Sequence, residues 1–260
     1  MQDDTRETVD IYRKALRQQG FSASAIYQRV RLLRGIGVPP ELATRNDVLR
    51  QLDRATAKST RRVYLNMLRT AFRDMRDLGL VDHDPTFGLR TPSPPRARPR
   101  PMNAHEIESV LSVGGRVRAW SILGYRAGLR AHEVVAVRKE HLRWTNHGWT
   151  LHVVGKGGVV AAIPAHAEVV ALLQSYPDYD GRLWPINPST MSSAWRVAAE
   201  SVGVRGRRFH DLRHTFATQV LNATGDLLVT RDLLRHASVQ TTQIYALPDE
   251  SRAFDAVAGL

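Results

Sequence analysis

The stretch His210-Asp211-Leu212-Arg213-His214 is the most informative part of this chain of 260 residues, because it sets an arginine between two histidines. Further cations stand at Arg130, within Gly-Leu-Arg-Ala-His-Glu-Val, and at His236, nine residues before Tyr245. A tyrosine can attack a phosphodiester only if the doubly charged transition state is neutralised, and such cations can supply that charge. The pattern therefore predicts a tyrosine nucleophile acting on a phosphodiester, and the fold must bring these distant segments together.

Composition indicates a polyanionic partner. The formal net charge is +12 and the isoelectric point is about 10.7, so double-stranded DNA is the economical explanation. Membrane surfaces are the competing polyanion, but no stretch reaches the roughly 20 apolar residues of a spanning helix, and the acidic start Met1-Gln2-Asp3-Asp4 is unlike a signal peptide. We expect a soluble, cytoplasmic protein with no membrane association. Cysteine is absent, so apolar burial must stabilise the fold.

Charge and proline content divide the chain. Residues 1–101 carry 20 lysines or arginines against 11 aspartates or glutamates, whereas residues 102–260 carry 17 against 14. Residues 91–101 contain five prolines, which disfavour helix and sheet and favour an extended connection. We predict a DNA-binding domain at 1–90, a linker at 91–101 and a second domain at 102–260. The linker residues suited to phosphate contact are Arg96, Arg98 and Arg100.

Periodic apolar residues predict an all-helical first domain. Helices are expected at about residues 5–19, 46–54 and 58–78, with another that starts after Ser22 or Ser24 and ends at Arg34. In the longest helix, the basic residues fall largely off the apolar stripe, where they could meet phosphates or base edges. The candidates for DNA contact are Lys58, Arg61, Arg62 and Arg69. A solvated basic face is the alternative for any one of them.

The second domain mixes helices with a small sheet, which predicts an α+β fold that is mainly α with a small antiparallel β-sheet. Helices are expected at about residues 103–111 and 117–127, again just after Arg130, and towards the end of the chain. Strands are expected at about residues 141–144, 149–154 and 159–163. The turn Gly155-Lys156-Gly157-Gly158 lies between strands and lacks the spacing and the following helix of a phosphate-binding loop, so we reject nucleotide binding there.

Each member of the cation cluster has an ordinary alternative. Arg130 could be a charge at a helix junction, Lys156 a hairpin lysine and Tyr245 a core aromatic residue. His210 and His214, four residues apart, could ligate zinc, but the glutamate of His-Glu-x-x-His is missing and no third ligand is evident. We therefore expect no metal site and a structural role for His214. The joint order and spacing of the cluster argue against these alternatives.

That order and spacing resemble the active-site motifs of the tyrosine recombinases, the phage integrase family. The residues that carry the resemblance are Arg130, Lys156, His210 to His214, Leu234-Arg235-His236 and Thr241 to Tyr245. The resemblance covers nearly the whole chain and implies a helical core-binding domain, a basic linker and a catalytic domain that together clamp DNA. Arg235 departs from the pattern, because the family usually has glycine at that position, and the departure bears on the conformation of the local loop.

The resemblance implies a role for each residue of the cluster. Tyr245 would attack the scissile phosphate and form a 3′-phosphotyrosyl link, with His210 assisting proton transfer at the phenol and Lys156 protonating the departing 5′ oxygen. The phosphate oxygens would be held by Arg130 and Arg213, with a further hydrogen bond from His236. Glu133 would support the site by holding a catalytic cation. No cofactor, metal or ATP is needed in this scheme.

The activity implied is conservative site-specific recombination of the phage-integrase type, which integrates or excises DNA. Four protomers would hold two inverted core-type sites and pass through a Holliday junction, and the protein would be monomeric when free. The chain begins almost at the core-binding helices, so we expect recognition of short core sites without arm-type sites. The tail from Leu247 to Leu260 has the spacing of an amphipathic helix and could dock on a neighbouring protomer. An excision-directing factor is a further candidate partner.

Three other functions fit the same residues. A Xer-like, transposon or plasmid resolvase differs in biological context more than in sequence. A type IB topoisomerase uses the same phosphotyrosyl chemistry but relaxes supercoils, and the core-binding domain favours a recombinase over it. A non-catalytic DNA-binding relative is the last alternative, and the intact set of cations with Tyr245 argues against it.

Overall fold

The computed structural model describes residues 4–91, 100–155, 158–177, 183–236 and 239–245. The chain forms two compact units, residues 1–96 and residues 97–260, and the division between them falls inside the proline-rich stretch. The predicted mixture of many helices with a small antiparallel sheet is confirmed. None of the helices in the described ranges is long and apolar enough to cross a membrane.

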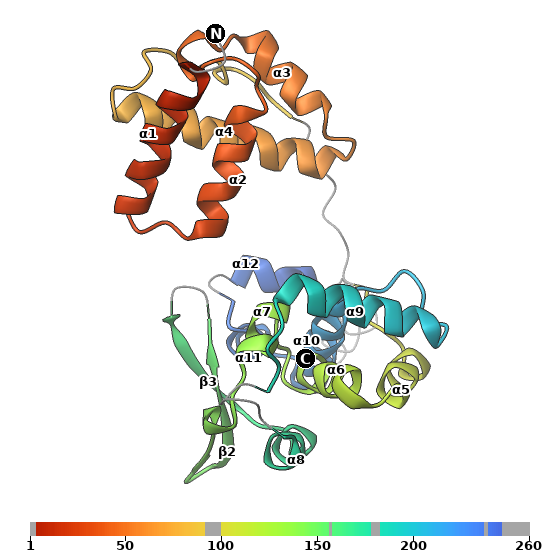
Figure 1. Ribbon diagram of the computed structural model, residues 1–260. Helices are drawn as coiled ribbons and strands as arrows, with labels where there is room; N and C mark the ends of the chain where they lie inside the picture. Colours follow the sequence, from red (N-terminus) through yellow and green to blue (C-terminus); the bar gives the residue numbers. More distant parts are fainter. Residues whose placement is uncertain (1–3, 92–99, 156–157, 178–182, 237–238, 246–260) are drawn as a thin grey trace, which may run out of the picture. The chain divides into compact units, whose positions relative to one another are not determined.

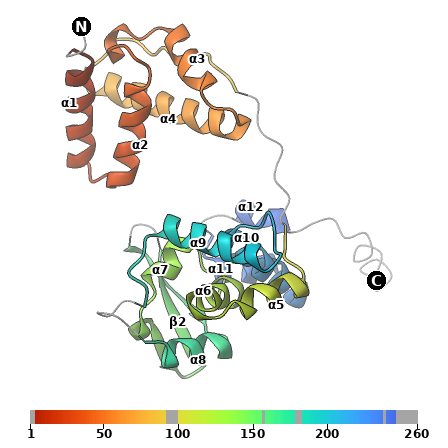
Figure 2. The same cartoon turned by 45° about the vertical axis from the view of Figure 1, so that its right-hand side comes forward.

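The first unit is a bundle of helices, each within about a residue of its predicted bounds. The helices are α1 (Asp4–Gln18), α2 (Ala23–Arg34), α3 (Arg45–Asp53) and α4 (Lys58–Asp77), with a 3-10 turn at Pro40–Leu42. Ser22 caps α2 by accepting a hydrogen bond from the Ala25 N–H, which settles the choice between Ser22 and Ser24. Helices α1 and α2 lie side by side, and α4 packs against α2 (Figures 1 and 2).

A polar contact ties these three helices together beside their apolar core. The Asp74 carboxylate on α4 accepts hydrogen bonds from the Tyr12 hydroxyl of α1 at 3.0 Å and from Arg29 of α2 at 2.8 Å. Burial, opposed in part by Arg29, raises the pKa of Tyr12 to about 12, so the phenol keeps its proton and remains a donor. The apolar stripe of α4 is buried against the other helices as predicted, and its basic residues remain at or near the surface.

The second unit consists of helices packed against a three-stranded sheet. The sheet runs in the order β1 (Leu142–Thr145), β2 (Gly148–Val154) and β3 (Val160–Pro164), with antiparallel pairing throughout. The helices before it are α5 (Ala104–Ser112), α6 (Gly115–Arg126) and α7 (Ala131–Ala136); those after it are α8 (Ala167–Ser175), α9 (Pro188–Ser201), α10 (Phe209–Thr224), α11 (Leu227–Leu234) and α12 (Val239–Thr242). A 3-10 turn at Gln243–Tyr245 follows.

Alternation along the strands buries one face of the sheet. Leu151 and Val153 of β2 and Ile163 of β3 are buried in the core of the unit, and Leu151 lies opposite Ile163 in the register. The sheet lies along one side of the unit and the helices cover its other side (Figure 1). His141, predicted to begin the first strand, instead ends a 3-10 turn at Lys139–His141, because a single residue at an element boundary is weakly specified by local pattern.

Two glycines allow α10 to approach the segment that carries Arg130. A β-carbon at Gly124 of α6 would lie 3.0 Å from the Phe209 ring and 3.1 Å from Leu212. At Gly128, which has a φ of +58°, a β-carbon would lie 2.5 Å from the Phe216 ring. Side chains at either position would push α10 away, so these glycines let the segment before α7 and the middle of α10 lie close together.

Candidate active site

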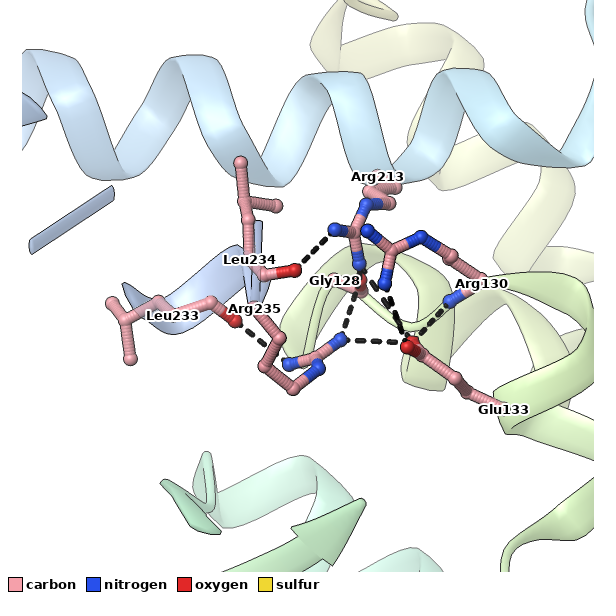
Figure 3. A network of polar contacts seen from close by, with 7 residues as sticks. All are labelled: Gly128, Arg130, Glu133, Arg213, Leu233, Leu234 and Arg235. Carbon is pink, nitrogen blue, oxygen red and sulfur yellow. Dashed lines mark hydrogen bonds and ion pairs between the residues drawn. The ribbon is translucent and has the colours of Figure 1, made fainter. Parts of the chain in front are cut away.

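Helix α10 presents His210, Arg213 and His214 at positions i, i+3 and i+4, and therefore on one face. Arg213 is only 1% exposed. Its two terminal nitrogens donate to the backbone carbonyls of Gly128 and Leu234 (Figure 3). Arg213 therefore links three segments that are far apart in the sequence: the turn before α7, α10 and the end of α11.

Glu133 is the anion at the centre of this network. Arg130, which precedes α7, donates to it twice, from its backbone N–H to Oε2 and from Nη1 to Oε1, each at 2.8 Å (Figure 3). Arg213 Nη1 lies 3.7 Å from Oε2 and Arg235 Nη2 lies 2.9 Å from it. Burial opposes the charge of Glu133, but Arg235, the Arg130 N–H and Arg213 outweigh it and hold the pKa of this carboxyl below its usual range.

The three arginines differ in their access to a ligand. Burial, followed by repulsion from Arg130 and Arg235, lowers the pKa of Arg213 to about 9, which still leaves it protonated at neutral pH. The Arg235 side chain is 8% exposed, whereas that of Arg130 is 31% exposed. Arg130 is thus the arginine of this cluster that is most open to a phosphate.

One cavity of about 540 Å³ joins this cluster to the sheet. Its lining includes Arg130, Glu133, Arg235 and His236, together with Gly155 at the end of β2. His236 Nδ1 lies 2.9 Å from the Thr242 hydroxyl. Burial and the positive charges of Arg213 and Arg130 lower the pKa of His236 to about 4. Lys156, the residue after Gly155, lies outside the described residues.

Tyr245 reaches a histidine other than the one assigned to it. Its hydroxyl lies 2.7 Å from His214 Nδ1, and the residue is 6% exposed. His210 contacts His214 instead of the phenol: the two imidazole rings pack edge-to-face at a centroid distance of 4.6 Å. Burial raises the pKa of the Tyr245 phenol, and the charges of Arg213 and Arg130 partly oppose this.

The contact of His214 with Tyr245 was not expected from the sequence. The signal available was its position on the same helix face as His210 and Arg213, but that position alone does not say which histidine the phenol meets. Burial lowers the pKa of His214. Burial and the charges of His214, Arg213 and Arg130 lower the pKa of His210 to about 4, although that residue is partly open to solvent.

The candidates for DNA contact in the first unit have mixed surroundings. Lys58 and Arg62 are exposed, Arg61 pairs with Asp53 at 2.5 Å, and Arg69 donates to the Leu89 carbonyl at 2.7 Å. A cavity of about 490 Å³ on this unit has a lining that includes Arg62, Asn66, Arg69 and Arg90. In the second unit, Arg100 is exposed and its carbonyl accepts from Arg207 at 3.0 Å. Arg96 and Arg98 lie outside the described residues.

Arg235, where the motif usually has glycine, has a backbone conformation that favours glycine. It ends α11 with φ 55° and ψ 45°, the left-handed conformation that glycine adopts most readily. The arginine therefore accommodates the turn that a glycine would make.

In the part of the chain that the structure describes, no group of three or more His, Cys, Asp or Glu side chains could hold a metal ion.

Solved structures of integrases share the fold of this chain. Lambda integrase, as a dimer bound to a COC′ core site, superposes with a TM-score of 0.73 at 17% identity, covering 92% of this chain and 76% of that one. The Tn1549 transposon integrase in complex with transposon right end DNA has a TM-score of 0.72 at 17% identity, covering 97% and 99%. The fold is that of the tyrosine recombinases.

Sequence comparison assigns the family. Residues 104–252 match the phage integrase family. Tyrosine recombinase XerD of Ralstonia nicotianae is 31% identical over 217 residues, 74% of this chain and 68% of the relative, and XerD of Listeria monocytogenes serotype 4b is 29% identical over 235 residues, 79% and 78%. The chain belongs to the phage integrase family of tyrosine recombinases, enzymes that cleave and rejoin DNA.

Proposed function

We propose that this protein is a site-specific recombinase that acts on short inverted core sites in double-stranded DNA, with Tyr245 as its nucleophile. The observation that carries the proposal is the position of the Tyr245 hydroxyl, 2.7 Å from His214 and within range of the charges of Arg130 and Arg213. A phenol that must ionise and attack a phosphate needs both a proton acceptor and nearby cations.

In the proposed reaction, the Tyr245 oxygen bonds to the scissile phosphorus and the bond from phosphorus to the 5′ oxygen breaks. The phenol proton leaves during the attack, and Lys156 returns a proton to the 5′ oxygen. The products are a 3′-phosphotyrosyl link and a free 5′-hydroxyl, so the energy of the phosphodiester is conserved. Attack by the 5′-hydroxyl of a partner strand reverses the steps and releases Tyr245.

The phosphate is held in the cavity beside the sheet by the charge of Arg130 and by a hydrogen bond from His236, whose pKa of about 4 leaves it neutral at pH 7. Arg130 and His236 both line that cavity. The Arg130 guanidinium is held by its hydrogen bond to Glu133. Arg213 keeps N–H groups that its carbonyl contacts do not use, because each terminal nitrogen carries two hydrogens. These fixed cations supply the charge for which other phosphoryl-transfer enzymes use metal ions.

His214 is the first proton acceptor in this scheme. Its Nδ1 is already hydrogen bonded to the phenol, and its lowered pKa keeps the imidazole neutral at pH 7. His210 then has an indirect role in proton transfer, since its ring contacts His214 and is the more exposed of the two.

We also expect four protomers to assemble on two DNA sites. Lambda integrase has been solved as a tetramer bound to a Holliday junction, which supports four protomers on two sites. We expect the reaction in the cytoplasm of a bacterial cell, with an excision-directing factor as a further partner.

Deletion of residues 249–260 should impair synapsis more than binding to a single site, and equal loss of both would argue for a folding role of this segment.

The direct test is trapping of the covalent intermediate. Purified protein is mixed with nicked duplexes tiled from the DNA that flanks its own gene, and a denaturing protein gel reports any covalent adduct. We expect an adduct that Tyr245→Phe abolishes and that maps the cleavage site. An adduct that persists in Tyr245→Phe would refute Tyr245 as the nucleophile, and DNA binding without any adduct would favour a non-catalytic relative.

A Xer-like resolvase is the second candidate, because XerD recombinases are among the sequence relatives of this chain. The two functions differ in their products. A plasmid with two directly repeated sites yields two smaller circles if the enzyme resolves them, whereas integration joins sites on separate molecules. Loss of supercoiling without recombinant products would instead indicate topoisomerase activity.

A further inference from the structure

Arg235 holds an unusual backbone conformation. It is the only non-glycine residue with a positive φ among the residues that the structure describes, with φ 55° at the end of α11. For an L-residue with a long side chain, this conformation costs free energy. Contacts elsewhere must offset that cost, and the side chain of Arg235 provides them.

The Arg235 side chain turns inward and is almost completely buried. Nη1 donates to the Leu233 carbonyl at 2.7 Å, and Nη2 donates to the Gly128 carbonyl at 3.1 Å and to Glu133 Oε2 at 2.9 Å (Figure 3). Arg213 donates to the same Gly128 carbonyl. Two arginines from different elements therefore hold the turn from which Arg130 projects.

Arg130 and Arg235 share the Glu133 carboxylate. Oε1 accepts from the Arg130 guanidinium, and Oε2 accepts from the Arg130 backbone and from Arg235. Arg213 stays 3.7 Å from Oε2, beyond hydrogen-bond distance. With Arg235 on Oε2, the carboxylate is fixed in the orientation that meets Arg130.

The cluster also has an excess of positive charge. Three guanidiniums surround one carboxylate, and those of Arg130 and Arg235 line the cavity to which Arg130 is partly open. A buried excess of like charge is unfavourable until an anion joins it. A phosphate in that cavity would complete the balance.

We propose that Arg235 is a positioning residue of the phosphate site: it fixes Glu133, and through Glu133 the Arg130 guanidinium. The proposal rests on the proposed function. It predicts that Arg235 acts on the rate of cleavage and has little effect on DNA affinity, since its side chain is 8% exposed and both terminal nitrogens are already hydrogen bonded within the protein.

The test measures the rate of Tyr245–DNA adduct formation on a nicked duplex at saturating protein, with the Kd for the same DNA measured separately. Arg235→Ala should slow adduct formation by about 10- to 100-fold, the scale expected for a misplaced catalytic group, with little change in Kd. Arg235→Gly should slow it equally, although glycine suits the left-handed turn. Arg235→Lys should recover part of the rate, because it restores the charge without the planar fork.

Glu133→Gln separates action through Glu133 from a general loss of structure. If Arg235 acts through this carboxylate, adduct formation by the double variant Arg235→Ala, Glu133→Gln should be about as slow as by the slower single variant. A double variant slowed by the product of the two single effects would overturn the proposal. A wild-type rate in Arg235→Gly would also overturn it.

Arg231→Ala is the matched control, because Arg231 lies on the same helix and pairs with the exposed Asp232 at 2.6 Å. Its rate should equal that of the wild type. If Arg235→Ala does not fold by circular dichroism, Arg235→Lys decides the question. Absence of any adduct from the wild type would refute the proposed function itself, whereas an adduct whose rate is the same in all folded Arg235 variants would refute only the role of Arg235.

Discussion

The arginines of α4 and those around Glu133 show two different uses of the same side chain. On α4, Arg62 and Arg69 lie at the surface beside a basic cavity, and Arg69 uses one terminal nitrogen to donate to the Leu89 carbonyl. Around Glu133, Arg213 and Arg235 are buried. The terminal nitrogens of Arg213 donate hydrogen bonds to backbone carbonyls, and Arg235 donates one to the Glu133 carboxylate. An exposed arginine can adjust to a DNA backbone, whereas a buried one holds a fixed charge in place. We therefore expect the exposed arginines to serve DNA affinity and the buried ones to serve catalysis.

The largest effect should come from Arg213. Arg213→Ala removes the side-chain donor to the Leu234 carbonyl and one of the two arginine donors to the Gly128 carbonyl, where Arg235 remains. This loss in a buried site should lower the free energy of unfolding of the second unit by about 2–5 kcal/mol. All five tryptophans lie in this unit, so urea unfolding followed by tryptophan fluorescence reports on it alone. Arg62→Ala should change this unfolding curve by less than about 0.5 kcal/mol. Equal effects of the two variants would contradict a structural role for Arg213.

The next largest effect should distinguish the two histidines of α10. His214→Gln should slow adduct formation by about 100-fold, because general-base catalysis typically contributes at least that much. His210→Gln should slow it by about tenfold or less, since His210 does not contact the phenol. Single-turnover rates on a nicked duplex measure both. A slower rate in His210→Gln than in His214→Gln would restore His210 as the direct partner of Tyr245.

A smaller effect is expected from the arginines of α4. Arg62→Ala or Arg69→Ala should weaken DNA binding and reduce the slope of log K against log salt by about 1 for each phosphate that the variant no longer neutralises. Arg13→Ala on α1, where Arg13 lies 3.4 Å from Asp10, is the control. The cleavage rate of pre-bound complexes should stay unchanged. A slower cleavage rate with unchanged affinity would contradict the division of roles.

A modest pH dependence should belong to the catalytic unit. The pKa values of His210 and His236 are lowered to about 4 in the folded protein, against about 6.5 in an unfolded chain. Between these values the unfolded state binds more protons, so stability should fall as pH decreases from about 6.5 to about 4. The double variant His210→Gln, His236→Gln should show a shallower fall in urea midpoint. An unchanged slope would contradict these shifts.

Chelation of metal ions should have the smallest effect. Because arginine side chains and Lys156 supply the positive charge in the proposed mechanism, adduct formation should be as fast in EDTA as without it. The nicked duplex assay with and without added Mg²⁺ is sufficient. A strict Mg²⁺ requirement for cleavage would defeat this expectation.

Local pattern was enough to predict most of the fold. The helices of the first unit and the strands of the sheet begin and end within about a residue of their predicted bounds, because apolar period, caps and glycine stops act between near neighbours in the chain. The same cues predicted the mainly α class with a small antiparallel sheet. His141 is an exception at the edge of an element, where period is least informative.

The order of the motifs predicted which residue types form the site, and its resemblance to the tyrosine recombinases is confirmed by the family match. The pairing of these residues could be read only from the folded chain. Tyr245 meets His214, Arg213 is buried, and Arg235 joins Glu133 across 102 positions of the chain. These contacts depend on how closely α10 packs against Gly124 and Gly128 and on how the end of α11 turns. Residue spacing places side chains on a helix face, but packing between distant elements selects their partners.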